Sequence, residues 1–170
     1  MGIGAKPTAR TWVRSNMHTM TFALHSIPPI PAPTPKSARP TPWFELPHAP
    51  APGSPVGALQ AFADGQATMV ELAAAQPDSP AFKLLVLRNG DAVHAFANRC
   101  AHFGVPLAAR QAQLIHQPLK SLTCNVHYAR YAWATGACEA GECDGDALSP
   151  VPLVQDADGL LRIGTKPDSV

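Results

Sequence analysis

The sequence lacks the features that would place it in a membrane, an export pathway or a complex with nucleic acid. No apolar run is long enough to cross a bilayer, and "MTFAL" is the longest apolar stretch near the start. No twin arginine occurs, nor an apolar segment followed by a small-residue cleavage site. The formal net charge is only +1, so the total gives no support for nucleic-acid binding. We therefore expect a cytoplasmic protein that binds neither membrane nor nucleic acid.

Cysteine is scarce, with four residues in 170. Because export is not expected, thiols or metal ligands are favoured over structural disulfides. No C-x₂-C occurs, which excludes the plant-type ferredoxin pattern. Cys138 and Cys143, in "ACEAGECDGDAL", are interpreted as ordinary thiols outside any ligand set. A mutual disulfide or a redox-sensitive pair is the alternative interpretation.

Proline is concentrated near the start of the chain, where it argues against a core. Eleven of the 19 prolines lie between Pro28 and Pro55. Such a segment lacks backbone donors and favours an extended linker. Residues 1–26 are basic and contain no acid. We expect a disordered tail here, with a targeting segment or a later start at Met17 or Met20 as the alternative.

The rest of the chain consists of short apolar runs separated by turn residues. No alternation of strands and helices is visible, and a short helix over 56–62 is the only helical expectation. Short strands with Gly-containing turns predict an all-β fold, an antiparallel β-sandwich or small barrel. The expected boundaries are a tail over 1–55, a folded domain over 56–165 and a C-terminal tail over 166–170. The expected strands are "ATMVEL" (67–72), "FKLLVLRNGDAVHAFAN" (82–98, turning at Asn89-Gly90), "LKSLTC" (119–124), "RYAWATGAC" (130–138, turning at Thr135-Gly136) and "VPLVQDADGLLRI" (151–163, turning at Asp158-Gly159).

Two cysteine–histidine pairs carry the chemistry. Cys100 and His102 form C-x-H, Cys124 and His127 form C-x-x-H, and 21 residues separate the pairs. Each pair follows a predicted strand, so each should lie on a short loop that fixes the ligand directions. Thiolate with imidazole suits zinc or iron–sulfur chemistry and does not suit magnesium or calcium. A nucleophilic Cys–His pair is the other interpretation, but it needs one activated thiolate, and the doubling argues against it.

The segments "CAHFGVPL" and "CNVHYARY" resemble the two cluster-binding loops of Rieske [2Fe–2S] proteins, in which two histidines replace two cysteines on one iron. The resemblance implies a Rieske-type sandwich with a cluster-binding subdomain and one cluster per subunit. It implies that Cys100 and Cys124 ligate one iron, and His102 and His127 the other. Further positions that match the family are Pro106-Leu107, Tyr131 and Thr135-Gly136.

Three positions depart from the Rieske proteins of respiratory complexes. Val105 and Val126 stand where those proteins carry two further cysteines joined as a disulfide. Ala129 stands where they place a serine that donates to a bridging sulfide. Fewer donors stabilise the added electron less, so we expect a potential in the lower part of the range of about −150 to +300 mV. Tyr131 is the one side-chain donor expected to tune the cluster.

The family resemblance implies a one-electron carrier between a reductase and a terminal oxygenase or another redox protein. Only 43 residues follow His127, and none of them is histidine. A separate iron site with two histidines and a carboxylate is therefore not expected, and neither is a substrate-converting site. A small Rieske subunit of a larger oxidoreductase is the first alternative. A structural Cys₂His₂ zinc module is the second, and it would be colourless.

Overall fold

The computed structural model describes Met1 and residues 40–166, so most of the expected tail lies outside the described residues. Within that part of the chain, strands and short 3₁₀ turns are the only regular elements, and no α-helix occurs. No helix there is long and apolar enough to cross a membrane. The elements are η1 (Trp43–Glu45), β1 (Pro55–Ala58), η2 (Leu59–Ala61), β2 (Ala67–Leu72), β3 (Phe82–Asn89), β4 (Ala92–Ala97), η3 (Gln111–Gln113), β5 (Ile115–Gln117), β6 (Ser121–Thr123), β7 (Arg130–Ala132), β8 (Cys138–Ala140), β9 (Leu153–Gln155) and β10 (Leu160–Ile163).

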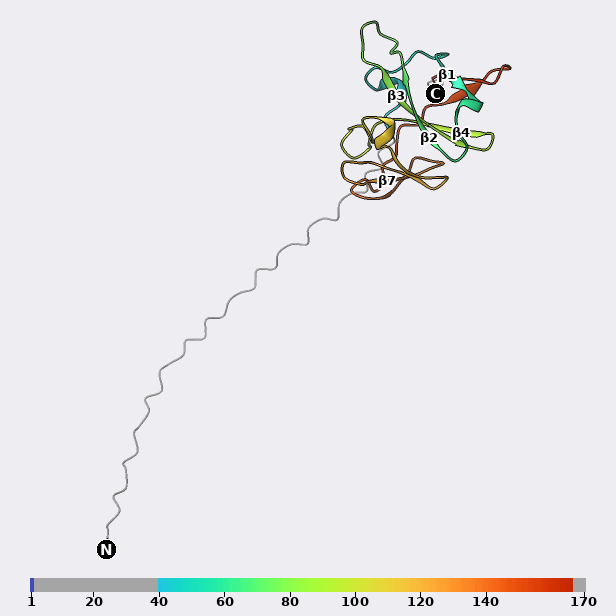
Figure 1. The fold of residues 1–170 in the computed structure, drawn as a ribbon. Coiled ribbons are helices and arrows are strands. Elements are labelled where there is room, and N and C mark those ends of the chain that lie inside the picture. Colours follow the sequence, from blue (N-terminus) through green and yellow to red (C-terminus); the bar gives the residue numbers. More distant parts are fainter. Residues whose placement is uncertain (2–39, 167–170) are drawn as a thin grey trace. The chain divides into compact units, whose positions relative to one another are not determined.

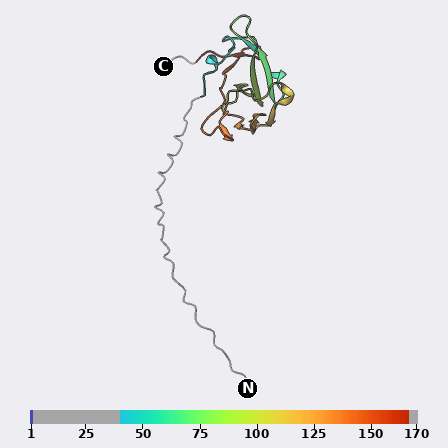
Figure 2. The ribbon, with the colours of Figure 1, turned by 90° about the vertical axis from the view of Figure 1, so that its left-hand side faces the viewer.

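The strands form three antiparallel sheets, which confirms the expected all-β fold. Their strand orders are β1-β10-β9, β2-β3-β4 and β5-β6-β7-β8. The third sheet, coloured yellow to orange, lies at the same end of the folded unit in both views, below the green strands β3 and β4 (Figures 1 and 2). The chain passes from the second sheet into the third through the first Cys–His segment.

Strand β3 separates two hydrophobic cores. Its residues 84–87 are an unbroken apolar run, and all four side chains are fully buried. Leu84 and Val86 point into one core, shared with β1 and β10. Leu85 and Leu87 point into the other, shared with both Cys–His segments and the third sheet. An apolar run without alternation is expected for a strand covered on both faces.

Two local predictions were wrong. The helix expected over 56–62 is strand β1 followed by the single turn η2. Val56, Leu59 and Phe62 are all buried, so their helix-like spacing reflects burial in the core, while pairing with β10 decides the backbone conformation. The β3–β4 turn lies one residue later than expected, because Asn89 pairs with Ala92 across it. The other predicted hairpins are confirmed.

The segment before the predicted domain start contributes to the core. Trp43 and Leu46 are buried with the side chains of β1 and β10, although both lie ahead of the expected boundary at residue 56. The packed residues therefore extend further toward the N-terminus than the prolines indicated. The domain boundaries themselves stay a prediction.

Two side-chain amides hold residues 108–111, which lie between the two Cys–His pairs, against the second sheet and the residue that follows it. Gln111 Oε1 accepts from Met69 N at 2.6 Å, and Gln111 Nε2 donates to Ala67 O at 3.0 Å. Both backbone groups belong to edge strand β2. The Gln111 side chain therefore pairs one N–H and one C=O that would otherwise be open to a further strand. Buried Asn98 likewise donates to Ala108 O at 2.7 Å.

Candidate metal centre

The two Cys–His segments fold into loops with the same backbone hydrogen bonds. Cys100 N–H donates to the carbonyl five residues later, Val105 O, at 2.7 Å, and Cys100 O accepts from Gly104 N at 2.8 Å. Cys124 N–H likewise donates to Ala129 O at 2.9 Å, and its carbonyl accepts from Tyr128 N at 3.0 Å. Each cysteine is therefore held at both of its backbone polar groups. We call the segments 100–105 and 124–129 loop 1 and loop 2.

The same position of each loop has a left-handed backbone. Gly104 has φ +69° and Tyr128 has φ +59°. Glycine adopts this conformation without cost, whereas tyrosine is strained there. A further hydrogen bond, from Asn125 N to Leu107 O at 2.9 Å, joins the backbone of loop 2 to the segment that directly follows loop 1. The loops therefore form one rigid framework.

Both loop cysteines are free thiols buried in the interior. Cys100 is 2% exposed and Cys124 is fully buried. Burial raises the pKa of the Cys124 thiol, opposed by the backbone N–H groups of Val126 and His127, while the neighbouring Cys100 raises it further. These N–H groups point at the sulfur and would stabilise a thiolate ligand. Metal binding here would release thiol protons.

The two histidines lie together, with ring centroids 5.5 Å apart. His102 has a side chain only 12% exposed, and its Nδ1 is buried without a hydrogen-bond partner. Its other nitrogen, Nε2, lies 3.2 Å from Glu142 Oε2. His127 is exposed. A buried ring nitrogen without a hydrogen-bond partner, two residues along the chain from the buried Cys100 thiol, is a group that a bound metal would satisfy.

Tyr131, on β7, lies against loop 1. Its hydroxyl is 3.1 Å from Cys100 Sγ and accepts from Ala101 N at 3.2 Å. Because Ala101 N–H occupies the oxygen as an acceptor, the phenol proton is free to point at the sulfur. Burial, reinforced by the contact with Cys100, raises the pKa of Tyr131, which keeps the phenol protonated. The contact needed for the predicted tuning role is present.

Large apolar side chains surround the histidines on the surface. Phe103, Val126 and Tyr128 are 64%, 48% and 69% exposed, respectively. The Phe103 ring centroid lies 3.8 Å from that of His102 and 5.3 Å from that of His127. Neither the loops' hydrogen bonds nor the core requires these side chains to be apolar. We call this group the apolar rim.

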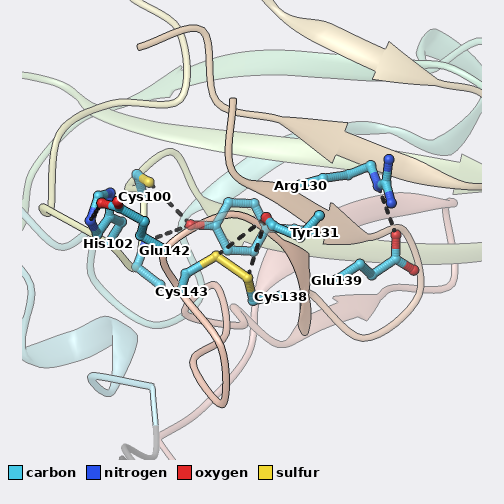
Figure 3. The surroundings of a disulfide bond; sticks show 10 residues. Cys100, His102, Arg130, Tyr131, Cys138, Glu139, Glu142 and Cys143 are labelled. Carbon is cyan, nitrogen blue, oxygen red and sulfur yellow. Dashed lines mark hydrogen bonds and ion pairs between the residues drawn. A yellow bond between two sulfur atoms is a disulfide. The ribbon is translucent and has the colours of Figure 1, made fainter. Parts of the chain in front are cut away.

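The interpretation of Cys138 and Cys143 as ordinary thiols was wrong, because they form a disulfide. Strand β8 and the turn after it bring their Cα atoms to 5.8 Å, which allows a bridge across five positions. The closed segment 138–143 carries two carboxylates. Figure 3 shows Glu142 beside His102 on one side of Tyr131 and Glu139 beside Arg130 on the other. No pattern in the sequence indicated the contact between Glu142 and His102.

The donor set suits a cluster with two ligands on each metal. Within residues 40–166, no group of three or more His, Cys, Asp or Glu side chains surrounds a single ion. A tetrahedral zinc site would need such a group, whereas a Rieske cluster takes two cysteines on one iron and two histidines on the other. Two cysteines and two histidines are the donor set that a Rieske [2Fe–2S] cluster takes.

Comparison with known proteins gives the family. Residues 54–153 match the Rieske [2Fe–2S] domain. The chain belongs to the Rieske family. Members of this family bind a [2Fe–2S] cluster, so the cofactor predicted from the sequence is confirmed at the level of the family. A search of curated proteins found no match.

Solved structures show the same fold at low identity. The ferredoxin of carbazole 1,9a-dioxygenase from Nocardioides aromaticivorans IC177 is 23% identical, with TM-score 0.51. The match covers 68% of this chain and 100% of that ferredoxin. The Sphingomonas yanoikuyae B1 ferredoxin is 22% identical, with TM-score 0.50, and 67% and 99% of the two chains are covered. The terminal oxygenase of carbazole 1,9a-dioxygenase from Novosphingobium sp. KA1 is 23% identical, with TM-score 0.52, and 69% and 32% are covered.

Proposed function

We propose that this Rieske protein is a one-electron carrier that holds its cluster on Cys100, Cys124, His102 and His127. When bound, the cluster takes up and releases one electron. The observation that carries the proposal is the asymmetry of the site: both thiols are buried, while His127 is exposed within the apolar rim. Electrons would therefore enter and leave on the histidine side.

The apolar rim suits a partner that docks briefly. Weak electron-transfer complexes bury small interfaces, with a total buried surface below about 1,200 Å². Three exposed side chains around two histidines can exclude water over the ligands without holding a partner for long. We infer that a terminal oxygenase accepts its electrons, because structural neighbours include complexes of an oxygenase with its ferredoxin, and that a reductase supplies them, as the family resemblance implies.

A stopped-flow experiment tests the carrier function. The full chain is reduced with dithionite, freed of excess reductant and mixed with cytochrome c, a soluble one-electron acceptor. We expect one electron to be delivered per cluster. A reduced chain that delivers no electron, or two, would overturn the proposal.

A matched pair of valine substitutions tests the docking side. Val126→Lys places a charge in the apolar rim, while Val154→Lys makes the same change on β9, where Val154 is 57% exposed. We expect Val126→Lys to slow the second-order rate several-fold, because cytochrome c is cationic, and Val154→Lys to leave it unchanged. Equal rates for the two variants would contradict transfer on the histidine side.

The cytoplasmic location predicted from the sequence remains part of this proposal. Structural disulfides are rare in the cytosol, so the bridge between Cys138 and Cys143 argues against this location. Fractionation of cells with detection of the native chain tests it directly. Recovery from a membrane or an exported fraction would contradict the prediction.

A further inference from the structure

The disulfide-closed segment 138–143 is fixed against loop 2. Cys143 is 1% exposed and belongs to the core that contains both loop cysteines. Gly141 lies so close to loop 2 that an added Cβ would be 2.9 Å from the Ala129 Cα. Arg130 and Glu139 pair at 3.4 Å at the other end of the segment. The segment therefore has a defined position over the candidate metal centre.

Glu142 needs this support to hold its contact with His102. The Glu142 side chain is 85% exposed. An exposed ion pair contributes little free energy, because the entropy lost by the long side chain offsets much of the attraction. The disulfide removes much of the segment's backbone freedom, since it closes a loop of only a few residues. Cys143, the residue after Glu142, is buried in the core and fixes the backbone there. Forming the contact with His102 therefore costs only the side-chain entropy of Glu142.

We propose that Glu142 is a positioning residue for His102 and that the Cys138–Cys143 disulfide holds it in place. The carboxylate accepts the Nε2 proton of His102, which leaves the buried Nδ1 without a proton as the nitrogen available to a metal. This inference rests on the proposed function, because the metal in question is the cluster. A carboxylate on a ligand imidazole raises ligand basicity and favours the oxidised state. Glu142 therefore lowers the midpoint potential.

The test compares two carboxylates of the same segment. Glu142→Gln keeps the shape and removes the charge beside His102, while Glu139→Gln makes the same change beside Arg130. We expect Glu142→Gln to raise the midpoint by roughly 20 to 40 mV. This is a two- to fivefold change in the redox equilibrium, the size expected for one exposed pair at 59 mV per tenfold. Glu139→Gln should leave the midpoint unchanged.

The part played by the disulfide is tested by a mutant cycle. The double variant Cys138→Ser/Cys143→Ser should raise the midpoint potential, as Glu142→Gln does. Adding Glu142→Gln to it should give little further change, because the contact is already lost. Full additivity would show that the disulfide does not act through Glu142. If the double variant does not fold, wild-type protein reduced with a phosphine replaces it in the cycle.

Iron and acid-labile sulfide analysis of every sample separates the two proposals. A full chain that binds no cluster overturns the proposed function, and this inference with it. A cluster present at wild-type level in Glu142→Gln, with an unshifted midpoint and an unchanged electron paramagnetic resonance spectrum, overturns only this inference. Equal shifts for Glu142→Gln and Glu139→Gln overturn it too, because they would reflect the charge of the segment and no particular contact.

Discussion

Loops 1 and 2 use the same backbone hydrogen bonds to present different side chains. In each loop, the backbone of the cysteine is hydrogen-bonded to the residues four and five positions later. The residue four positions after the cysteine has a left-handed backbone. Loop 1 keeps His102 largely covered, with Glu142 on its outer nitrogen. Loop 2 leaves His127 exposed. One framework therefore gives one positioned histidine and one presented to solvent.

The left-handed position shows where the molecule accepts strain. Loop 1 meets the requirement with Gly104, and loop 2 places Tyr128 there at φ +59°. A non-glycine residue in this region costs about 1–3 kcal/mol. Tyr128 is 69% exposed, so core packing does not offset that cost. The strain lies where an aromatic side chain is presented beside His127, which supports a role of the apolar rim in docking.

The largest expected effect comes from replacing a proposed cluster ligand. Cys124→Ser should abolish the cluster, because serine cannot supply the soft thiolate that the site requires. Visible absorption and acid-labile sulfide should both be lost. Cys138→Ser makes the same chemical change in the disulfide and should retain the cluster. A Cys124→Ser protein with wild-type sulfide content would remove Cys124 from the ligand set.

The next largest effect exchanges the residues at the left-handed position. Gly104→Ala should destabilise the protein by about 1–2 kcal/mol, because alanine is strained at this φ and its Cβ would meet the Arg99 guanidinium. Tyr128→Gly should stabilise it by about 0.5–1 kcal/mol by relieving strain. Urea unfolding measures both changes. Destabilisation by Tyr128→Gly would show that the tyrosine side chain contributes packing.

A smaller effect tests the tuning of loop 1 by Tyr131. Tyr131→Phe removes the hydroxyl 3.1 Å from Cys100 Sγ and should lower the midpoint by about 60 mV. That is a tenfold change in equilibrium, or about 1.4 kcal/mol, near the lower end for a hydrogen bond to a charged acceptor. Tyr128→Phe removes an exposed hydroxyl next to loop 2's histidine and is the matched control. A potentiometric titration in which both variants keep the wild-type midpoint would rule out Tyr131 as a donor.

The smallest effect lies outside both loops, in the turn between β9 and β10. The hydrogen bond from Leu160 N, with the further bond from Arg162, lowers the pKa of the Asp156 carboxyl. A carboxyl with a lowered folded-state pKa stabilises the protein above its unfolded pKa, near 3.8, and loses that stabilisation as the pH falls through the folded value. Asp156→Asn should therefore weaken stability slightly at neutral pH, with the difference vanishing in acid. Urea midpoints against pH measure it, and a difference that grows in acid would contradict the assignment.

Local signals in the sequence predicted the hairpins and the ligand loops. Turns containing Gly136 and Gly159 lie where glycine was expected to reverse the chain, with φ of +69° and +79°. The two Cys–His pairs could be recognised because short spacing along the chain places both candidate ligands of a pair on one loop. Nothing beyond neighbouring residues was needed for these predictions.

Features that depend on distant pairing were not predictable in the same way. Residues 56–62 carry a helix-like spacing, and only the partner strand β10 shows that the segment is a strand. The burial of Trp43 in the core was not predicted, because the prolines around it indicated an extended linker. The contact of Glu142 with His102 spans 40 positions and depends on β8 and the disulfide. Each case depends on contacts between distant parts of the chain, which the sequence alone does not specify.

The most direct test of the central claim is metal and sulfide analysis of the full chain purified under anaerobic conditions. We expect about two iron atoms and about two acid-labile sulfide ions per chain, in a red-brown protein whose colour fades partly on reduction. A colourless protein with about one zinc ion per chain and no labile sulfide would contradict the assignment of Cys100, His102, Cys124 and His127 to a Rieske cluster.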